Sequence, residues 1–382
     1  MGHILTIQDL KTLSKKRVPK MFYDYADSGS WTEQTYQENE NDFSKIKLRQ
    51  RVAVNISERS TKSKMLGFPI SLPVALAPCG LTGMQRADGE ILAAKAAEKF
   101  NVPFTMSTLS ICSIEDVAEN SNAPFWFQLY VMKDKQYTKN VIDRAKKAGC
   151  SALMLTVDLK VMGQRHKDIR NGLSAPPKLQ SISTLMDLVF RPKWCFDMLR
   201  TNRRSFGNVI GHVDGVSDLS SLIAWVGEAF DLEFTWDDVS EIKELWGGKL
   251  IIKGILDEED VQQAVKSGAD ALVVSNHGGR QLDGTSSSIS ILPSIVESVG
   301  GSVEVWLDGG IRSGQDVLKA MALGAKGTLI GRPYLYGLGA MGEEGVKRCL
   351  EIIKKELDLT MALCGHVNIN DVTADIIRST NF

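Results

Sequence analysis

The sequence lacks several features that would place it in other classes of protein. No apolar run reaches about 18 residues, the length that a membrane-spanning helix needs. Its first residues, MGHILTIQDLKTLSKK, contain no long apolar stretch followed by a small-residue cleavage site, so we expect no export. The formal net charge is only −1, so no excess of basic residues favours nucleic acid as a partner. These absences predict a cytoplasmic protein.

Metal and nucleotide motifs are absent as well. The six cysteines form no CxxC pair, which argues against a zinc site and a disulfide framework and favours a reducing compartment. We therefore expect no metal. No Walker lysine motif is present, so a nucleoside triphosphate is not the expected ligand.

What the sequence does contain is a repeating unit of apolar strand and amphipathic helix. The predicted strands are residues 74–77, 103–107, 125–131, 152–157, 250–255, 271–275, 303–307 and 327–330. The predicted helices between them are residues 89–99, 114–119, 137–147, 258–266, 289–299 and 315–323. Eight such units predict a (β/α)8 TIM barrel, an α/β fold. An open doubly wound sheet is the alternative, but no GxGxxG follows the first strand.

The predicted domain organisation is one domain over residues 1–382, with the barrel at about residues 73–345. A helical and irregular segment over residues 4–45 precedes the barrel. One connection, after the fourth strand, is far longer than the usual two to six or so residues of a βα loop. It predicts an insertion at about residues 173–234.

Residues 178–204 within this insertion contain six basic and two acidic side chains, interleaved with tryptophan, phenylalanine and leucine. Such a mixture is typical of a segment that lies on a membrane surface. A lid packed on the barrel and a partner-binding loop are the alternatives. Membrane contact would make the protein peripheral on the cytoplasmic face of the inner membrane.

The ends of the predicted strands carry polar residues or glycine, at the edge where barrel enzymes place their chemistry. His277 is the one histidine of five at such an end, which makes it the candidate general base. Asp158, at the end of the fourth strand, could orient the imidazole and stabilise its charged form. The alternatives are a polar loop with an incidental histidine, and a helix cap or solvated residue at position 158.

Basic residues near the strand ends suggest an anionic substrate and an anionic cofactor. Arg165 and Arg280 offer two guanidinium groups to a carboxylate. Lys253 could form a salt bridge or steady negative charge on a reduced cofactor. Glycine-rich turns at residues 308–312 and 331–332 predict a phosphate site, with Arg312 and Arg332 as donors. Ordinary turns with surface arginines are the alternative, and spacing alone does not name the cofactor.

These motifs together carry a resemblance. From about residue 23 to 373 the chain resembles the FMN-dependent 2-hydroxy acid dehydrogenase and oxidase family, and the segment 275–283 (SNHGGRQLD) is the most specific match. The supporting matches are 75–78 (ALAP), 127–131 (FQLYV), 156–158 (TVD), 253–254 (KG), 307–312 (LDGGIR) and 331–333 (GRP).

The resemblance implies FMN as the cofactor and assigns roles to matching positions. His277, paired with Asp158, would take the substrate proton. Tyr25, Arg165 and Arg280 would hold the substrate carboxylate, and Tyr130 would contact its hydroxyl group. The implied FMN contacts are Ala77, Pro78, Cys79, Ser107, Gln128, Thr156, Lys253 and Ser275, with Asp308, Gly309, Gly310, Arg312, Gly331 and Arg332 at the phosphate.

Within the family, residues 48–51, Trp126, residues 253–257 and the long insertion are most similar to bacterial respiratory L-lactate dehydrogenases. This similarity implies oxidation of L-lactate, or a close L-2-hydroxy acid, to the 2-oxo acid, with a quinone or cytochrome as the electron acceptor and a tetramer as the assembly. Leu109 replaces the tryptophan of glycolate oxidase, which predicts a substrate larger than glycolate. The alternatives are an oxidase that forms H2O2, a mandelate-type dehydrogenase, and a non-redox phosphate-binding barrel or inactive scaffold.

Overall fold

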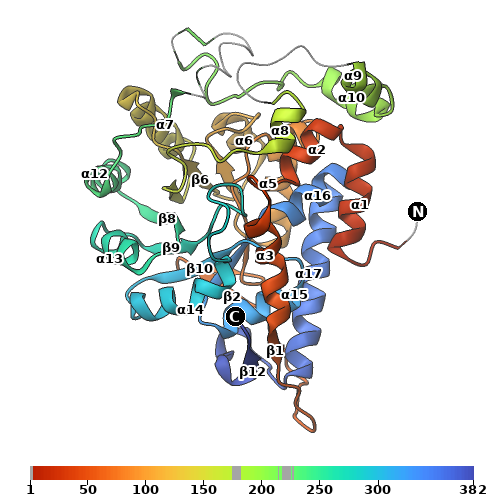
Figure 1. Ribbon diagram of the computed structural model, residues 1–382, viewed down its shortest axis with the longest axis vertical. Coiled ribbons are helices and arrows are strands. Elements are labelled where there is room, and N and C mark those ends of the chain that lie inside the picture. Colours follow the sequence, from red (N-terminus) through yellow and green to blue (C-terminus); the bar gives the residue numbers. More distant parts are fainter. Residues whose placement is uncertain (1–2, 174–181, 214, 217–224, 226–227) are drawn as a thin grey trace.

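A closed ring of parallel strands forms the centre of the computed structural model (Figure 1), which describes residues 3–173, 182–213, 215–216, 225 and 228–382. Its strands are β4 (Val74–Leu76), β5 (Thr105–Ser107), β6 (Trp126–Leu129), β7 (Ala152–Thr156), β8 (Lys249–Ile255), β9 (Ala271–Val274), β10 (Glu304–Asp308) and β11 (Gly327–Ile330). Within the described residues these eight strands follow the order β4-β11-β10-β9-β8-β7-β6-β5. A bridge between Leu76 and Phe104 closes the ring. The predicted barrel is confirmed.

Helices surround the ring, and most of them follow a strand. They are α4 (Thr82–Gln85), α5 (Gly89–Phe100), α6 (Ile114–Asn120), α7 (Lys135–Lys147), α12 (Trp236–Trp246), α13 (Glu258–Lys266), α14 (Ser288–Val299), α15 (Gly314–Ala322), α16 (Arg332–Met341) and α17 (Glu343–Leu363). Short polar side chains fix several helix starts: Ser113 accepts from the Asp116 amide at α6, and Ser313 from the Asp316 amide at α15. The predicted helices begin within two residues of the observed ones.

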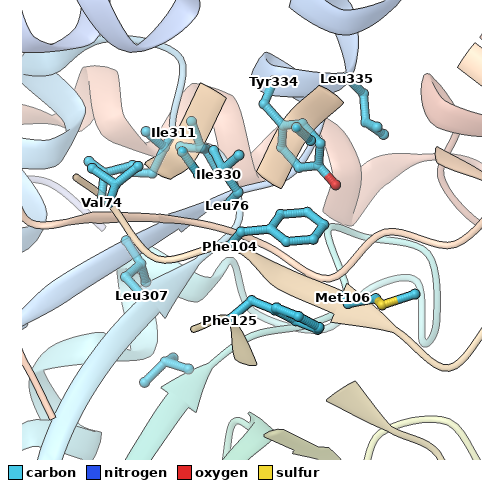
Figure 2. Packing of buried hydrophobic residues seen from close by; sticks show 14 of the residues in the cluster. Val74, Leu76, Phe104, Met106, Phe125, Leu307, Ile311, Ile330, Tyr334 and Leu335 are labelled. Atoms are coloured by element: carbon cyan, nitrogen blue, oxygen red, sulfur yellow. The ribbon is translucent and has the colours of Figure 1, made fainter. Parts of the chain in front are cut away.

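The outer core lies between the strands and these helices. Every residue of β9 is buried, as expected of a strand covered on both faces. Figure 2 shows part of the layer, where Leu76 of β4 and Ile330 of β11 lie near Tyr334 and Leu335 of α16. The Tyr334 hydroxyl donates to the carbonyl of Ala77, so this packing also fixes the end of the first barrel strand.

A hairpin of β2 (Ser63–Met65) and β3 (Phe68–Ile70) plugs the amino-terminal end of the ring. Met65 and Ile70 belong to the cluster inside the barrel, together with Trp126 and Trp306, whose rings stack at 5.1 Å. The Leu66 amide donates to Glu304, the first residue of β10. With this end filled, the other end is left to form a site.

The segment before the barrel folds back onto its later part. It contains α1 (Ile7–Arg17), α2 (Lys20–Ala26), α3 (Gln34–Asn41) and β1 (Ile46–Leu48), and β1 pairs antiparallel with β12 (Ile377–Thr380). In Figure 1 α1 runs beside α16. The helical character predicted for residues 4–45 is therefore found, whereas the β1–β12 and β2–β3 pairings were not predicted.

The long connection between β7 and β8 contains α8 (His166–Arg170), α9 (Ile182–Val189) and α10 (Pro192–Arg200). In Figure 1 α9 and α10 lie beyond α8 and α2, at the outer edge of the molecule. The Trp194 indole donates to the Met84 carbonyl at 2.9 Å and stacks on Phe22 at 5.5 Å, which anchors α10 to the barrel. Residues 178–181 of the predicted membrane segment lie outside the described residues. No helix in the described parts of the chain is long and apolar enough to cross a membrane.

Candidate active site

A cavity of about 720 Å³ lies at the carboxyl ends of the barrel strands. Most of the predicted site residues line it: Tyr25, Ala77, Pro78, Cys79, Ser107, Tyr130, Arg165, Lys253, His277, Arg280, Asp308, Gly309, Gly310, Arg312, Gly331 and Arg332. The other predicted residues, Gln128, Thr156, Asp158 and Ser275, are buried or half-buried at the ends of β6, β7 and β9. Residues far apart in the sequence are thus brought together at one end of the barrel.

His277 and Asp158 form a pair at the end of the barrel. The His277 Nδ1 lies 2.8 Å from Asp158 Oδ1, and the His277 amide donates to Ser275 Oγ at 3.1 Å. His277 has a left-handed φ of 58°, which is uncommon for a residue with a side chain and needs surrounding contacts to hold it. These two hydrogen bonds, one from the ring and one from the backbone, fix the direction of the imidazole.

The pKa values of both members of the pair are lowered, which favours a neutral His277 beside an ionised Asp158. Burial lowers the pKa of His277, against the attraction of Asp158, so the imidazole is neutral at neutral pH. Burial alone would raise the pKa of Asp158, but His277 and Lys253 outweigh it and the pKa is lowered. An ionised carboxylate holds the Nδ1 proton and leaves Nε2 as the basic nitrogen.

Lys253 lies at the centre of a buried polar cluster. Its Nζ is 2.9 Å from Ser275 Oγ and 3.0 Å from Asp308 Oδ2, and the Ser275 hydroxyl donates to the same Asp308 oxygen at 2.8 Å. Burial acts to lower the pKa of Lys253, but the effects of Asp308 and Asp158 are larger and the pKa is raised above its ordinary value. The ammonium therefore keeps its charge. The Asp308 carboxylate is thus committed to Lys253, which leaves only its backbone for the predicted phosphate site.

Arg165 and Arg280 face the same cavity. The Arg280 Nη1 donates to the carbonyl of Tyr25 at 2.5 Å, and its guanidinium lies 4.7 Å from the centre of the Tyr25 ring. Burial and the neighbouring Arg165 lower the pKa of Arg280. Arg165 Nε is buried without a hydrogen-bond partner among the described residues. Two neighbouring positive groups, one with an unused donor, have the chemistry that binds a carboxylate or another anion.

The glycine-rich turns predicted to bind phosphate are packed tightly against the amino-terminal segment. A Cβ built on Gly310 would lie 1.8 Å from the carbonyl oxygen of Asn39 in α3, so only glycine fits there. Arg312 pairs with Glu40 at 2.8 Å, and Arg332 donates to the carbonyls of Ala26 and Ser28. Both arginines line the cavity while held by the protein's own oxygens.

Two buried donors near the carboxyl ends of β6 and β7 have no partner among the residues that the structure describes. Gln128 Nε2 and Thr156 Oγ1 have no hydrogen-bond partner within the described chain. The other end of the Gln128 amide accepts from Ser107 Oγ at 3.0 Å, which fixes its orientation. Because buried polar atoms are normally paired, these atoms indicate a polar ligand.

Several cavity residues were not predicted. Phe206 and Phe230 come from the insertion, and Phe230 meets the Tyr130 ring edge-on at 5.7 Å. Asp168 follows Arg165 by three residues and lines the cavity as well. Only the position of Asp168 carried a usable signal, since an acid three residues from a proposed anion-binding arginine lies on the same helical face.

Comparison with known proteins places the chain in a family. The family model of FMN-dependent dehydrogenases matches residues 14–379, so the chain belongs to that family. Among its relatives, the L-lactate dehydrogenase of Acinetobacter baumannii is 44% identical over 370 residues, covering 97% of this chain and 96% of the relative. The L-lactate dehydrogenase of Actinobacillus pleuropneumoniae is 42% identical over 375 residues, covering 98% of each chain.

Solved structures agree with this placement. The monotopic membrane protein (S)-mandelate dehydrogenase superposes with a TM-score of 0.94 at 34% identity, covering 100% of each chain. A soluble mutant of the membrane-associated (S)-mandelate dehydrogenase from Pseudomonas putida gives a TM-score of 0.83 at 32% identity, with 99% and 100% coverage. FMN is accordingly the cofactor, and the residues present fit it: the unpartnered Gln128 and Thr156 donors suit the polar edge of a flavin ring, and Lys253 supplies a buried cation.

Proposed function

We propose that the protein oxidises L-lactate, or a close L-2-hydroxy acid, to the 2-oxo acid, pyruvate in the case of lactate. Electrons then pass to a quinone or cytochrome of a respiratory chain. The observation that carries this proposal is that the neutral His277 imidazole, paired with the ionised Asp158, faces the same cavity as the guanidinium groups of Arg165 and Arg280. A 2-hydroxy acid has the two groups that such a cavity can bind, a proton to be removed and a carboxylate.

His277 acts as the base in this proposal. Its Nε2 accepts the substrate proton, while Asp158, 2.8 Å from Nδ1, fixes the orientation of the ring. Once the imidazole is protonated, the Asp158 carboxylate stabilises its positive charge. A lowered His277 pKa keeps the base in its neutral, proton-accepting form before substrate binds.

The carboxylate of the substrate would lie between Arg165 and Arg280, with Tyr25 fixed beside Arg280. Two guanidinium groups hold a carboxylate in one orientation. Tyr130, braced by Phe230, would contact the hydroxyl group. Burial raises the pKa of Tyr130, so its phenol is a hydrogen-bond donor throughout the physiological range.

The residues proposed to hold FMN lie at the carboxyl ends of the barrel strands and in the glycine-rich turns. Ala77, Pro78, Cys79, Ser107, Gln128, Thr156, Lys253 and Ser275 would contact the ring, and Asp308, Gly309, Gly310, Arg312, Gly331 and Arg332 the phosphate through backbone and guanidinium groups. When bound, FMN supplies the two-electron acceptor for the substrate. Burial raises the pKa of the Cys79 thiol to about 11, so this neighbour of the cofactor is neutral.

We also propose that α9 and α10 lie against the membrane. Trp194 and Met198 face the protein, whereas Val189, Phe190 and Leu199 are 66%, 69% and 71% exposed. Such large exposed apolar side chains within one short segment favour a partner surface. The structural likeness to a monotopic membrane protein supports a membrane as the partner of these side chains. The protein would then be peripheral on the cytoplasmic face of the inner membrane. The homotetramer that the family resemblance implies stays a prediction, which a measurement of the molar mass by light scattering would test.

The test is steady-state turnover of the FMN-loaded protein with two substrates and two acceptors. We expect kcat/KM for L-lactate to exceed that for D-lactate by orders of magnitude, and a water-soluble quinone to be reduced much faster than O2. Hydrogen peroxide as the main product would make the protein an oxidase. Turnover of neither lactate isomer would reject the substrate.

A mandelate-type dehydrogenase is the second candidate. It is favoured by the TM-score of 0.94 and by the apolar residues Leu109, Phe206 and Phe230 in the cavity lining, which could contact an aromatic ring. The ratio of kcat/KM for L-lactate and (S)-mandelate decides between the two.

A further inference from the structure

Asp168 is a cavity carboxylate to which the proposed chemistry assigns no role. It lies on α8, three residues after Arg165, and only 7% of its surface is exposed. Its Oδ2 is 3.5 Å from Arg165 Nη1, a long contact, and its Oδ1 is buried without a hydrogen-bond partner within the described residues. A buried carboxylate oxygen without a partner is costly, so its presence beside the anion site calls for a reason.

The charges around Asp168 belong to the same site. Burial raises its pKa, while Arg280 and Arg165 oppose that shift and Asp24 adds to it. Asp168 in turn raises the pKa of Arg280. The two guanidinium groups and this one carboxylate therefore interact as a set, and their formal charges leave one net positive charge for a ligand.

The other carboxylate among the described lining residues has a different partner. Asp308 is 3.0 Å from the Lys253 ammonium and accepts from Ser275. The Asp308 charge is thereby neutralised by Lys253, whereas Asp168 Oδ1 has no hydrogen-bond partner within the described residues. Asp168 is therefore the described lining carboxylate whose charge acts on a ligand held by Arg165 and Arg280.

We infer that Asp168 is a specificity-determining residue that restricts the cavity to acids with one carboxylate and disfavours 2-hydroxy acids with two. This inference rests on the proposed function for its substrate class. A ligand with one negative charge meets two positive groups and one negative group. A second carboxylate brings another charge into the field of Asp168. The other cations among the described lining residues are already engaged: Lys253 and Arg312 pair with Asp308 and Glu40, Arg332 donates to the carbonyls of Ala26 and Ser28, and Arg204 donates to those of Thr201 and Leu199.

The electrostatic argument gives a measurable ratio. Removing the Asp168 charge strengthens binding of a monoanion by one charge–charge interaction and binding of a dianion by roughly two. At an effective dielectric constant of about 20, one such interaction over several Å corresponds to a change of at least roughly tenfold. The dianion-to-monoanion preference should therefore rise by at least roughly tenfold.

The experiment measures binding to the FMN-loaded protein without turnover. Propionate and malonate serve as the monoanion and dianion, and their dissociation constants are read from the change in the flavin absorption spectrum. In Asp168→Asn we expect malonate to gain at least about tenfold relative to propionate. Asp168→Glu keeps the charge and should keep the wild-type ratio.

Asp24→Asn is the matched control. Asp24 also lies close to Asp168, but it pairs with Lys20 and accepts from Asn171 and does not line the cavity. We expect little change in its malonate-to-propionate ratio. Asp168→Ser supplies a second neutral variant if the asparagine variant does not fold.

An unchanged ratio in the neutral variants, with both ligands weakened alike, would overturn the inference and reduce Asp168 to a structural residue. A ratio that shifts equally in Asp24→Asn would also overturn it. Because binding requires no lactate oxidation, failure of the proposed function would leave this result interpretable. Where turnover is present, kcat/KM for L-malate relative to L-lactate should rise in Asp168→Asn as well.

Discussion

The fixed imidazole of His277 is the feature on which the proposed chemistry depends. In His277→Gln the side chain keeps its polarity but cannot take up a proton. We expect the variant to keep FMN, as judged by its visible spectrum, and to lose roughly 10²–10⁴-fold in kcat or more. Near-normal turnover by a variant with full flavin content would remove His277 from the mechanism.

The effect of Asp158 on His277 predicts a direction of pH dependence. The base must be neutral, so kcat/KM should fall as the pH drops through the pKa of His277, which lies below its ordinary value. Asp158 raises that pKa, so Asp158→Asn should move the acidic limb to lower pH while reducing the plateau, because the imidazolium loses its counter-charge. A limb that moves to higher pH would contradict the pairing. The profile is measured with L-lactate at constant ionic strength.

Leu109 gives a prediction about substrate size. It lines the cavity, and its carbonyl lies 3.3 Å from the position that a Cβ on Gly80 would take. Leu109→Trp should fill this part of the cavity and raise the kcat/KM ratio of glycolate to L-lactate by roughly tenfold or more. Leu109→Met, which conserves volume, is the control. Equal ratios in the two variants would mean that this wall does not select for size.

At the level of single residues, the sequence predicted the His277–Asp158 pair but not the other pairings at the strand ends. The rule that chemistry lies at the carboxyl ends of barrel strands was enough to select His277, Asp158 and Lys253. It could not predict that Asp308 pairs with Lys253, because Asp308 was assigned to the phosphate site, or that Arg312 pairs with Glu40, because Glu40 lies on α3, outside the barrel.

Among the secondary-structure elements, the helices were predicted best because their signals are local. Gly149 and Gly268 lie just beyond α7 and α13 and have φ values of 74° and 81°. Both adopt the left-handed conformation that stops a helix. Two helices of the insertion, α9 and α10, were expected only as a basic and apolar segment, since their position depends on contacts such as that between Trp194 and Met84.

The exposed apolar side chains of the α9–α10 segment give a prediction about membrane contact. Phe190→Glu combined with Leu199→Glu places two charges where apolar side chains are 69% and 71% exposed. We expect the variant to lose most of its co-sedimentation with vesicles that contain anionic lipid, because charged groups do not enter the apolar layer. Its turnover with a water-soluble acceptor should be unchanged.

Leu363→Glu is the matched control for this experiment, since Leu363 is 60% exposed on α17. It should leave vesicle binding intact. Equal loss of binding in both variants would indicate a non-specific effect of charge. Full binding by the double variant would show that α9 and α10 are not the membrane contact.

For the whole molecule, the eight-fold alternation of strand and helix was sufficient to predict a closed barrel. The β2–β3 plug and the β1–β12 pair were not predicted, because each strand has three or four residues and β1 pairs with a segment over three hundred residues away. Such short strands carry no clear periodicity. That residues 1–382 form one domain stays a prediction.

The central claim is that this FMN-dependent dehydrogenase takes electrons from L-lactate and gives them to a respiratory acceptor. It is tested most directly by adding L-lactate to the FMN-loaded protein without oxygen and following the visible flavin band, first under nitrogen, then in air, then with a quinone analogue. We predict bleaching that persists in air and is reversed by the quinone. Bleaching that reverses rapidly in air with formation of peroxide would contradict the proposed acceptor, and no bleaching at all would contradict L-lactate as the substrate.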